Sequence, residues 1–531
     1  MLNQYQTYNS KIIRLLLLAG ILLIASFEVP IALLPPTARD ALIYHLAYPK
    51  LYLHQGRIFE LPFAFYSYYP MNTELLFMAP LYFNKDVLAA LIHMAFGLMT
   101  ATLIYYYLKD KIDKTYALLG AFIFLSTPIV IKLSTIPYVD LALAFHSTVA
   151  LLAFFRWKGR NKTEWLVVSS IFAGLAAGTK YNGLYIPLIL SIMILHASRK
   201  NHHFRTVFTF LLVSIAVASP WYIKNLLLRG NPFFPLSFGI FSGLNAQDQP
   251  TVPALLKRHL FYGENWLEIL LVPLRVFFQG RDDDMQHFDG VLNPILLILL
   301  PFAFRVKNSD IGYMKLFSIF YFLLVFFTAD MQIRFLLPIL PLLIILTVTG
   351  IKQVMDFTGT KSIVATGVAL LLSLNLVYLI YYFKEKEPLP YLKGMITRDE
   401  YLLKHQRGYT AIRYINQNLP LQAKILMVYT GDRGYYIERE YYYNSYLSGQ
   451  PLREPIEGSK NALDVARKIK GTGATHILMD ERIFDEFIEN NLDERQKLLY
   501  YDFLKGYLTK LHASDGYILY EISGVKYTKS S

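Results

Sequence analysis

The sequence predicts an α-helical polytopic membrane protein with about eleven transmembrane helices and a C-terminal α/β domain. Three observations support this fold class. Long apolar segments recur up to residue 384 and then stop. Only 17% of the residues are charged, against roughly 25% in ordinary soluble domains. Of the net charge of +13, nearly all lies before residue 385, so the basic excess belongs to the membrane part.

The first apolar segment, residues 12–34, contains only Arg14 and Glu28 as charged residues. It reaches the roughly 20 residues that a spanning helix needs. A cleaved signal peptide is the alternative, because Lys11 and Arg14 precede an apolar core, but the segment is too long and no small-residue cleavage site follows. Ten further apolar segments are expected to span the membrane, at residues 87–108, 115–134, 138–155, 164–179, 182–197, 206–228, 291–304, 312–328, 335–350 and 362–383.

Loop charges predict the orientation, because cytoplasmic loops accumulate Lys and Arg. Every second connection is basic, with residues such as Lys109, Lys111, Arg156, Lys158, Arg199, Lys200, Arg305 and Lys352. We therefore expect an integral protein of a bacterial inner membrane or an archaeal plasma membrane, with a cytoplasmic N-terminus. Residues 1–384 form its transmembrane domain, with outer loops at 35–86 and 229–290, and residues 385–531 form a soluble extracytoplasmic domain.

This orientation limits the chemistry. Nucleotide sugars and ATP are absent outside the cytoplasm, so a reaction there needs a substrate already activated and carried across by a lipid. Nucleic-acid binding is disfavoured, because topology explains the basic charge. The chain has no cysteine, which excludes disulfides, thiolate metal sites and a cysteine nucleophile.

The C-terminal region alternates amphipathic and short apolar segments. Helices are expected at 409–420 and 463–470, and strands at 424–429, 475–479 and 516–522. The segment Gly431–Tyr436 is typical of a strand-to-loop junction, with no glycine-rich phosphate fingerprint after it. The domain is expected to be a scaffold or to bind the acceptor.

Several segments together resemble the GT-C class of polytopic glycosyltransferases, near the protein mannosyltransferases and aminoarabinose transferases. They are Asp40 with Tyr44–Tyr52, then Tyr69–Glu74, Pro137–Leu141, Gly174–Leu184, Pro220–Asn225, Gly230–Pro235 and Gln332–Pro338. The resemblance implies an inverting hexosyl or pentosyl transferase, with Asp40 at the outer end of the first span as catalytic base. The sequence departs from the pattern of this class at two places. Ala41 stands where many relatives have a second acidic residue, and Tyr69–Met71 stands where some have His-Pro-Pro.

The implied reaction moves a sugar from a polyprenyl phosphate to an acceptor lipid, polysaccharide or protein. A carboxylate can take the proton of the attacking acceptor, which assigns the role of general base to Asp40. Lys180 and Arg334, each in a short outer connection, are placed to bind the donor phosphate. No cofactor is required, and dependence on a divalent metal stays open.

Each candidate also has a purely structural interpretation. Asp40 could cap the helix after it. Asp140 is either a second active-site carboxylate or a solvated interfacial group, Lys180 could extend to the headgroups, and Arg334 could be an interfacial anchor. His45 and Glu74 are possible acceptor-binding or supporting residues, although packing roles are favoured. The acidic run Asp282–Asp284 lacks the ligand spacing of a cation site and is expected to be a solvated loop.

Two other functions are compatible with a polytopic chain, a transporter and a membrane-anchored sensor with an external ligand-binding domain. A transporter would be expected to show internal repeats and polar residues near the bilayer midplane. Here the ionisable candidates lie at outer span ends and no repeat is evident, while a sensor needs neither the Asp40 loop nor so many spans. The transferase is therefore favoured.

Overall fold

The computed structural model describes residues 2–198, 203–236, 253–356, 361–443 and 452–523. The chain divides into two compact units. The first contains residues 1–34, 69–227 and 250–393, and the second contains residues 35–68, 228–249 and 394–531. The basic residues Arg199 and Lys200 and the stretch 237–252 of the second predicted loop lie outside the described residues.

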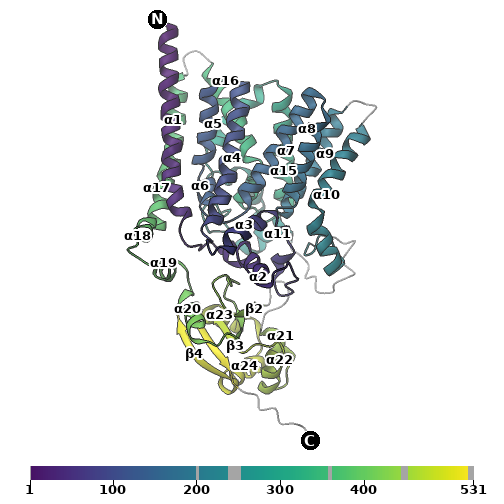
Figure 1. Ribbon diagram of the computed structural model, residues 1–531, viewed down its shortest axis with the longest axis vertical. Coiled ribbons are helices and arrows are strands. Elements are labelled where there is room, and N and C mark those ends of the chain that lie inside the picture. Colours follow the sequence, from purple (N-terminus) through teal and green to yellow (C-terminus); the bar gives the residue numbers. More distant parts are fainter. Residues whose placement is uncertain (1, 199–202, 237–252, 357–360, 444–451, 524–531) are drawn as a thin grey trace. The chain divides into compact units, whose positions relative to one another are not determined.

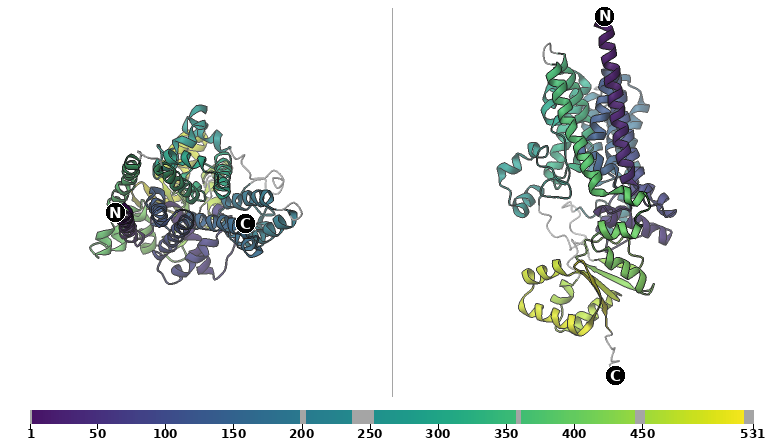
Figure 2. Two further views of the ribbon diagram at one scale, coloured as in Figure 1. Left: turned by 90° about the horizontal axis from the view of Figure 1, so that it is seen from above. Right: turned by 90° about the vertical axis from the view of Figure 1, so that its left-hand side faces the viewer.

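The first unit is a bundle of helices (Figure 1). Helix α7 packs against α8 and α4, and α4 packs against α5. Helices α1 and α17 run side by side in both views (Figures 1 and 2). The longer helices are α1 (Leu2–Ala32), α3 (Asn72–Tyr82), α4 (Leu88–Lys111), α5 (Lys114–Ser126), α7 (Asp140–Arg160), α8 (Thr163–Ala177), α9 (Tyr185–Ala197), α10 (His203–Arg229), α15 (Ser309–Thr328), α16 (Leu340–Met355) and α17 (Lys361–Lys386).

Shorter helices connect these elements. They are α6 (Pro128–Ser134), η3 (Tyr181–Leu184), α11 (Ala254–Tyr262), α12 (Trp266–Leu270), α13 (Val272–Arg275), α14 (Ile295–Leu299), η4 (Leu300–Arg305), η5 (Ile333–Leu336) and α18 (Pro388–Leu392).

All eleven segments predicted to span the membrane contain helical structure. By length and apolar composition, five described helices can cross a membrane, namely α1, α4, α10, α15 and α17. A sixth crossing is possible if α5 and α6, which meet at a bend of 66°, count as one broken span. Four further apolar helices are shorter. The helical membrane fold is confirmed, while the number of eleven spans stays a prediction.

Local sequence explains the helix ends and one close contact. Asp113 caps α5 by accepting hydrogen bonds from the backbone N–H groups of Thr115 and Tyr116, at 2.6 and 3.1 Å. Pro128 opens α6 after the extended Thr127, which produces the bend. At Gly174 a Cβ atom would lie 2.5 Å from the carbonyl oxygen of Ser214, so only glycine lets α8 and α10 approach this closely.

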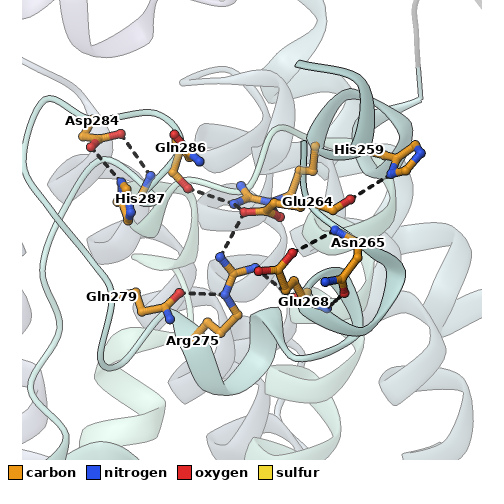
Figure 3. A network of polar contacts seen from close by, with 10 residues as sticks. His259, Glu264, Asn265, Glu268, Arg275, Gln279, Asp284, Gln286 and His287 are labelled. Atoms are coloured by element: carbon orange, nitrogen blue, oxygen red, sulfur yellow. Dashed lines mark hydrogen bonds and ion pairs between the residues drawn. The ribbon is translucent and has the colours of Figure 1, made fainter. Parts of the chain in front are cut away.

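A buried ion-pair network organises α11–α13 in the second long loop (Figure 3). Arg258 donates two hydrogen bonds to the Glu264 carboxylate, at 2.6 and 2.7 Å, and Arg275 donates a third at 3.0 Å. Burial raises the pKa of Glu264, but the hydrogen bonds from the two arginines outweigh it and hold that pKa below its ordinary value. A polar cavity of about 420 Å³ adjoins this network, lined among others by Tyr262, Glu268, Arg275, Phe278, Arg281 and His287.

The second unit contains a five-stranded mixed sheet in the order β2-β1-β3-β5-β4. Strand β1 pairs in parallel with β2 and β3, whereas β5 pairs antiparallel with β3 and β4. The strands are β1 (Lys424–Val428), β2 (Glu440–Tyr443), β3 (His476–Asp480), β4 (Leu508–Ser514) and β5 (Tyr517–Ile522). The helices are η1 (Ala41–His45), α2 (Ala47–Gln55), η2 (Phe65–Tyr68), α19 (Arg398–His405), α20 (Tyr409–Asn418), α21 (Arg453–Glu457), α22 (Ala462–Gly471), α23 (Glu481–Asn491) and α24 (Glu494–Tyr507).

The expected α/β character of the C-terminal region is confirmed, and so are the helices near 409–420 and 463–470 and the three expected strands. One face of the sheet packs with α21–α24 into an apolar core that includes Val428, Ile469, Ile477, Phe503 and Ile518. Helix α20 contacts β4 and β5. The sheet therefore has the layered packing that gives an α/β domain its own core.

Asp432 lies in the segment between β1 and β2 and has a positive φ of 59°. Burial raises the pKa of this carboxyl to about 6, and the nearby charge of Arg39 only partly opposes the shift. Arg39 directly precedes Asp40, so the C-terminal domain places an acidic group beside this part of the chain.

We predict that Glu264→Gln lowers the stability of the protein, because it leaves the buried Arg258 without its anionic partner. Breaking such a pair costs about 3 kcal/mol or more. Thermal unfolding in detergent, followed by circular dichroism, should show a clear fall in the melting temperature. Glu268→Gln is the matched control, since Glu268 caps α12 in an exposed position and its loss should have a small effect. Equal shifts for both variants would contradict the structural role of Glu264.

The raised pKa of Asp432 predicts a specific pH dependence. The folded state holds the Asp432 proton more tightly than the unfolded state, so this residue contributes less stability as the pH rises from about 4 to 6. Asp432→Asn removes this dependence. The melting temperature of the variant should therefore rise relative to that of the wild type between pH 4.5 and pH 7, and parallel curves for the two proteins would refute the prediction.

Candidate active site

Asp140 and Lys180 form a buried ion pair in the first unit. Asp140 is the first residue of α7 and is fully buried, and the Lys180 ammonium donates to its Oδ1 atom at 2.9 Å. The other carboxylate oxygen, Oδ2, is buried and has no hydrogen-bond partner in the part of the chain that the structure describes. Asp140 is thus no solvated interfacial group, and Lys180, at 9% exposure, does not extend into solvent.

Close backbone packing shapes the turn that carries Lys180. A Cβ atom at Gly178 would lie 2.2 Å from Nδ2 of Asn72, and one at Gly183 would lie 2.0 Å from the carbonyl oxygen of Ala176. Asn72 also donates its backbone N–H to the Gly178 carbonyl at 2.9 Å. The two glycines of the predicted motif therefore allow the turn to fold tightly between α8 and η3.

Arg334 lies beside this pair on η5. Its Nε atom donates to Oε1 of Gln332 at 2.7 Å, and its guanidinium lies 5.4 Å from the centroids of both the Tyr138 and Phe335 rings. The Lys180 ammonium lies 4.7 Å from the same Phe335 ring. Both cations interact electrostatically with Asp140. The structure thus brings together Asp140, Lys180 and Arg334, three of the predicted site residues.

His93 fixes the position of Asp140 and was not identified from the sequence. Its Nε2 atom accepts from the backbone N–H of Leu141 at 2.9 Å, so Nδ1 carries the proton and donates to the carbonyls of Leu133 and Ile136, at 2.8 and 2.9 Å. The ring therefore joins α4 to the start of α7. A single histidine within an apolar span was the only sequence signal for this role.

In the acidic run of the second loop, Asp282 and Asp283 pair with Lys132 and Asp284 accepts a hydrogen bond from the backbone N–H of His287, while Asp283 is exposed, as expected of a solvated loop. The Lys132 ammonium lies 3.3, 3.0 and 3.2 Å from carboxylate oxygens of Asp282, Asp283 and Asp289. Asp289 in turn lies 4.0 Å from Nε of Arg334. The carboxylates are far apart in sequence from Lys132, so only the folded chain reveals this contact. Within the described ranges, no group of three His, Asp or Glu side chains could hold a metal ion.

Asp40 belongs to the second unit and directly precedes the π-helix η1. The alternative interpretation as a helix cap is wrong, because its side chain makes no capping hydrogen bond. Instead, the Tyr44 hydroxyl donates to Asp40 Oδ2 at 3.3 Å, and the Tyr44 ring stacks on Tyr66 at a centroid distance of 4.7 Å. Asp40 is thus oriented by an aromatic side chain on its own helix.

The two weaker candidates are both buried. His45 is 1% exposed, and its ring lies 4.0 Å from that of Tyr44. Glu74 is 2% exposed in the first turn of α3. A role for either residue in acceptor binding stays a prediction.

Comparison with known proteins agrees with this architecture. Residues 50–223 match the sequence profile of the dolichyl-phosphate-mannose-protein mannosyltransferase family. This stretch includes Asp140 and Lys180. No curated protein sequence matches the chain.

Solved structures match over nearly the whole length. ArnT from Cupriavidus metallidurans in the apo state has 13% identity and a TM-score of 0.59, with 95% of this chain and 97% of that chain covered. The same protein bound to undecaprenyl phosphate has a TM-score of 0.58, with the same identity and coverage. The archaeal oligosaccharyltransferase AglB from Archaeoglobus fulgidus, in complex with an inhibitory peptide and a dolichol-phosphate, has 15% identity, a TM-score of 0.51 and coverage of 97% and 75%.

These matches run through the helical bundle and the C-terminal domain alike, because they cover about the whole of this chain. Together with the apolar helices they establish the architecture. The protein is an integral membrane protein with the fold of the GT-C class of glycosyltransferases.

Proposed function

We propose that this protein transfers a sugar from a polyprenyl-phosphate donor to an acceptor on the extracytoplasmic side of the membrane, with inversion at the anomeric carbon. The observation that carries the proposal is the cluster of Asp140, Lys180 and Arg334 within a GT-C fold. Two proteins of similar fold were solved with undecaprenyl phosphate or a dolichol-phosphate, which are lipids of the proposed donor class.

Lys180 and Arg334 would bind the donor phosphate. One carboxylate, Asp140, faces the two cations, so these three residues carry one net positive charge. Negative charge builds on the phosphate as its bond to the sugar breaks, and cations fixed beside it stabilise that charge. The shared Phe335 ring and the buried position exclude water, which strengthens each electrostatic interaction.

Asp40 would act as the general base. The acceptor oxygen or nitrogen attacks the anomeric carbon, the bond from that carbon to the phosphate oxygen breaks, and the acceptor proton passes to the Asp40 carboxylate. The hydrogen bond from Tyr44 orients that carboxylate. Direct displacement by the acceptor inverts the configuration of the sugar.

Asp140 would serve as the second carboxylate of the site. Its Oδ1 atom is occupied by Lys180, whereas Oδ2 is buried and has no hydrogen-bond partner among the residues described. A buried oxygen of this kind is costly unless a polar group fills the position. We infer that Oδ2 accepts a hydrogen bond from a hydroxyl of the sugar or the acceptor.

The proposal includes the predicted orientation, with a cytoplasmic N-terminus and an extracytoplasmic C-terminal domain. It leaves hexose and pentose donors open, and likewise a lipid, polysaccharide or protein acceptor. Neither a transporter nor a sensor is favoured by any observation of the site.

We predict that Asp40→Asn abolishes transfer while the protein still inserts into the membrane. Loss of a general base lowers rates by about 10² to 10⁴. Mass spectrometry of envelope glycans and glycoproteins should show that a product of the wild type is missing both in the variant and in a strain without the protein. Asp502→Asn, at an exposed acid on α24 of the C-terminal domain, is the matched control and should retain the product. Normal product from Asp40→Asn would refute the proposed base.

We predict that Arg334→Met weakens use of the donor, because one of the two cations beside the phosphate is lost. With membrane fractions and a polyprenyl-phosphate sugar, kcat/KM for the donor should fall by about 10², and Arg334→Lys should recover part of it. Arg305→Met is the control, since Arg305 lies at the end of η4 and contacts Phe302. Equal kcat/KM values for Arg334→Met and the control would contradict the phosphate-binding role.

A further inference from the structure

The C-terminal domain contacts the chain on both sides of Asp40. The Tyr436 hydroxyl donates to the carbonyl of Pro36 at 2.7 Å, four residues before Asp40. The Tyr435 backbone N–H donates to the carbonyl of Leu42 at 3.2 Å, two residues after Asp40. Two consecutive residues of the C-terminal domain thus hold the backbone that flanks the proposed base.

Further contacts extend this interface along residues 35–68. The Lys50 ammonium donates to the carbonyl of Tyr435 at 2.9 Å and lies 5.2 Å from the centroid of its ring. The hydroxyls of Tyr48 and Tyr443 lie 2.8 Å apart, and both side chains are buried. Phe63 meets the Tyr443 ring edge-on at 5.3 Å. The interface is therefore closely packed and hydrogen-bonded in its interior.

The contacting segment, Gly431–Tyr443, is itself anchored in the C-terminal domain. Asn416 on α20 donates to the carbonyl of Tyr436 at 2.8 Å and accepts from the N–H of Glu438 at 2.9 Å. The Arg439 guanidinium donates to the carbonyls of Leu419 and Asn416, at 2.8 and 2.9 Å. Strand β1 precedes the segment, and strand β2 forms its C-terminal end. Because the sheet anchors this segment, the segment can hold the contacting residues 35–68 in a fixed position.

The backbone that follows Asp40, which the C-terminal domain contacts, has an uncommon conformation. Residues Ala41–His45 form a π-helix, in which the N–H of Leu46 donates to the carbonyl of Ala41 at 3.0 Å. Short π-helical turns are rare and often occur at functional sites. Contacts from outside the segment favour a π-helical turn over the ordinary α-helical hydrogen-bonding pattern. The hydrogen bond from the Tyr435 N–H to the Leu42 carbonyl lies within this turn.

We propose that the segment Gly431–Tyr443 is a brace by which the C-terminal domain positions Asp40. Tyr435, Tyr436 and Lys50 are positioning residues, which act on the proposed base through the backbone around it. This inference rests on the proposed function for its effect on catalysis, whereas the mechanical role of the brace can be measured by itself. It gives the C-terminal domain a role in catalysis that needs no catalytic group of its own.

The test is the double variant Tyr436→Phe/Lys50→Met, which removes two brace hydrogen bonds and leaves Asp40 in place. Because the chain has no cysteine, Ala38→Cys provides a single site for a spin label beside Asp40. Electron paramagnetic resonance should show a more mobile label in the double variant, and kcat for transfer should fall about 10-fold because the base is less well positioned, with the donor KM nearly unchanged. The matched control is Tyr414→Phe/Lys510→Met, because the Tyr414 ring stacks on His512 and Lys510 is an exposed residue of β4.

An unchanged label in Tyr436→Phe/Lys50→Met would overturn the brace, whatever the activity of that variant. Increased mobility together with normal product from Asp40→Asn would support the brace and refute the proposed base, so the two failures are distinguishable. If the double variant does not insert into the membrane, Tyr436→Phe alone removes the bond to Pro36 and is measured in the same way.

Discussion

The ion pair between Asp140 and Lys180 is the interaction on which the site depends. An isolated charge inside a membrane protein is costly, so each of these residues requires the other. Their meeting requires α7 to begin at Asp140, which His93 fixes through the N–H of Leu141, and it requires the tight glycine turn before η3. The packing of these helices is therefore linked to the Asp140–Lys180 ion pair. Arg334 adds a second cation beside Asp140.

The second long loop extends this arrangement by ion pairs. Lys132 holds Asp289, and Asp289 lies within reach of Arg334, so the position of the candidate phosphate-binding arginine depends on a loop more than forty residues before it. Elsewhere in the loop, the buried Glu264 carboxylate forms ion pairs with two arginines, Arg258 and Arg275. Charges in this loop therefore serve mainly to fix structure.

The C-terminal domain is joined to the Asp40 segment by contacts within one compact unit. These contacts give the C-terminal domain a structural role, although no catalytic motif is evident in it. A proton acceptor must be held in a narrow range of positions to act in a displacement reaction. A sheet-anchored segment beside a short π-helix can provide that rigidity, whereas a free loop at a membrane surface cannot.

The sequence by itself determined the membrane class, the helical segments and the α/β character of the C-terminal region, and it predicted the residues of the candidate site. These features depend on local composition and periodicity, which can be read directly from a single sequence. The structure decided that Asp140, Lys180 and Arg334 meet and that Lys132 pairs with Asp282 and Asp283. It also showed that His93 supports α7 and that residues 35–68 pack with the C-terminal domain. Such contacts join residues 40 to about 400 positions apart, and only packing of the whole chain selects them, because many pairings satisfy the same local patterns.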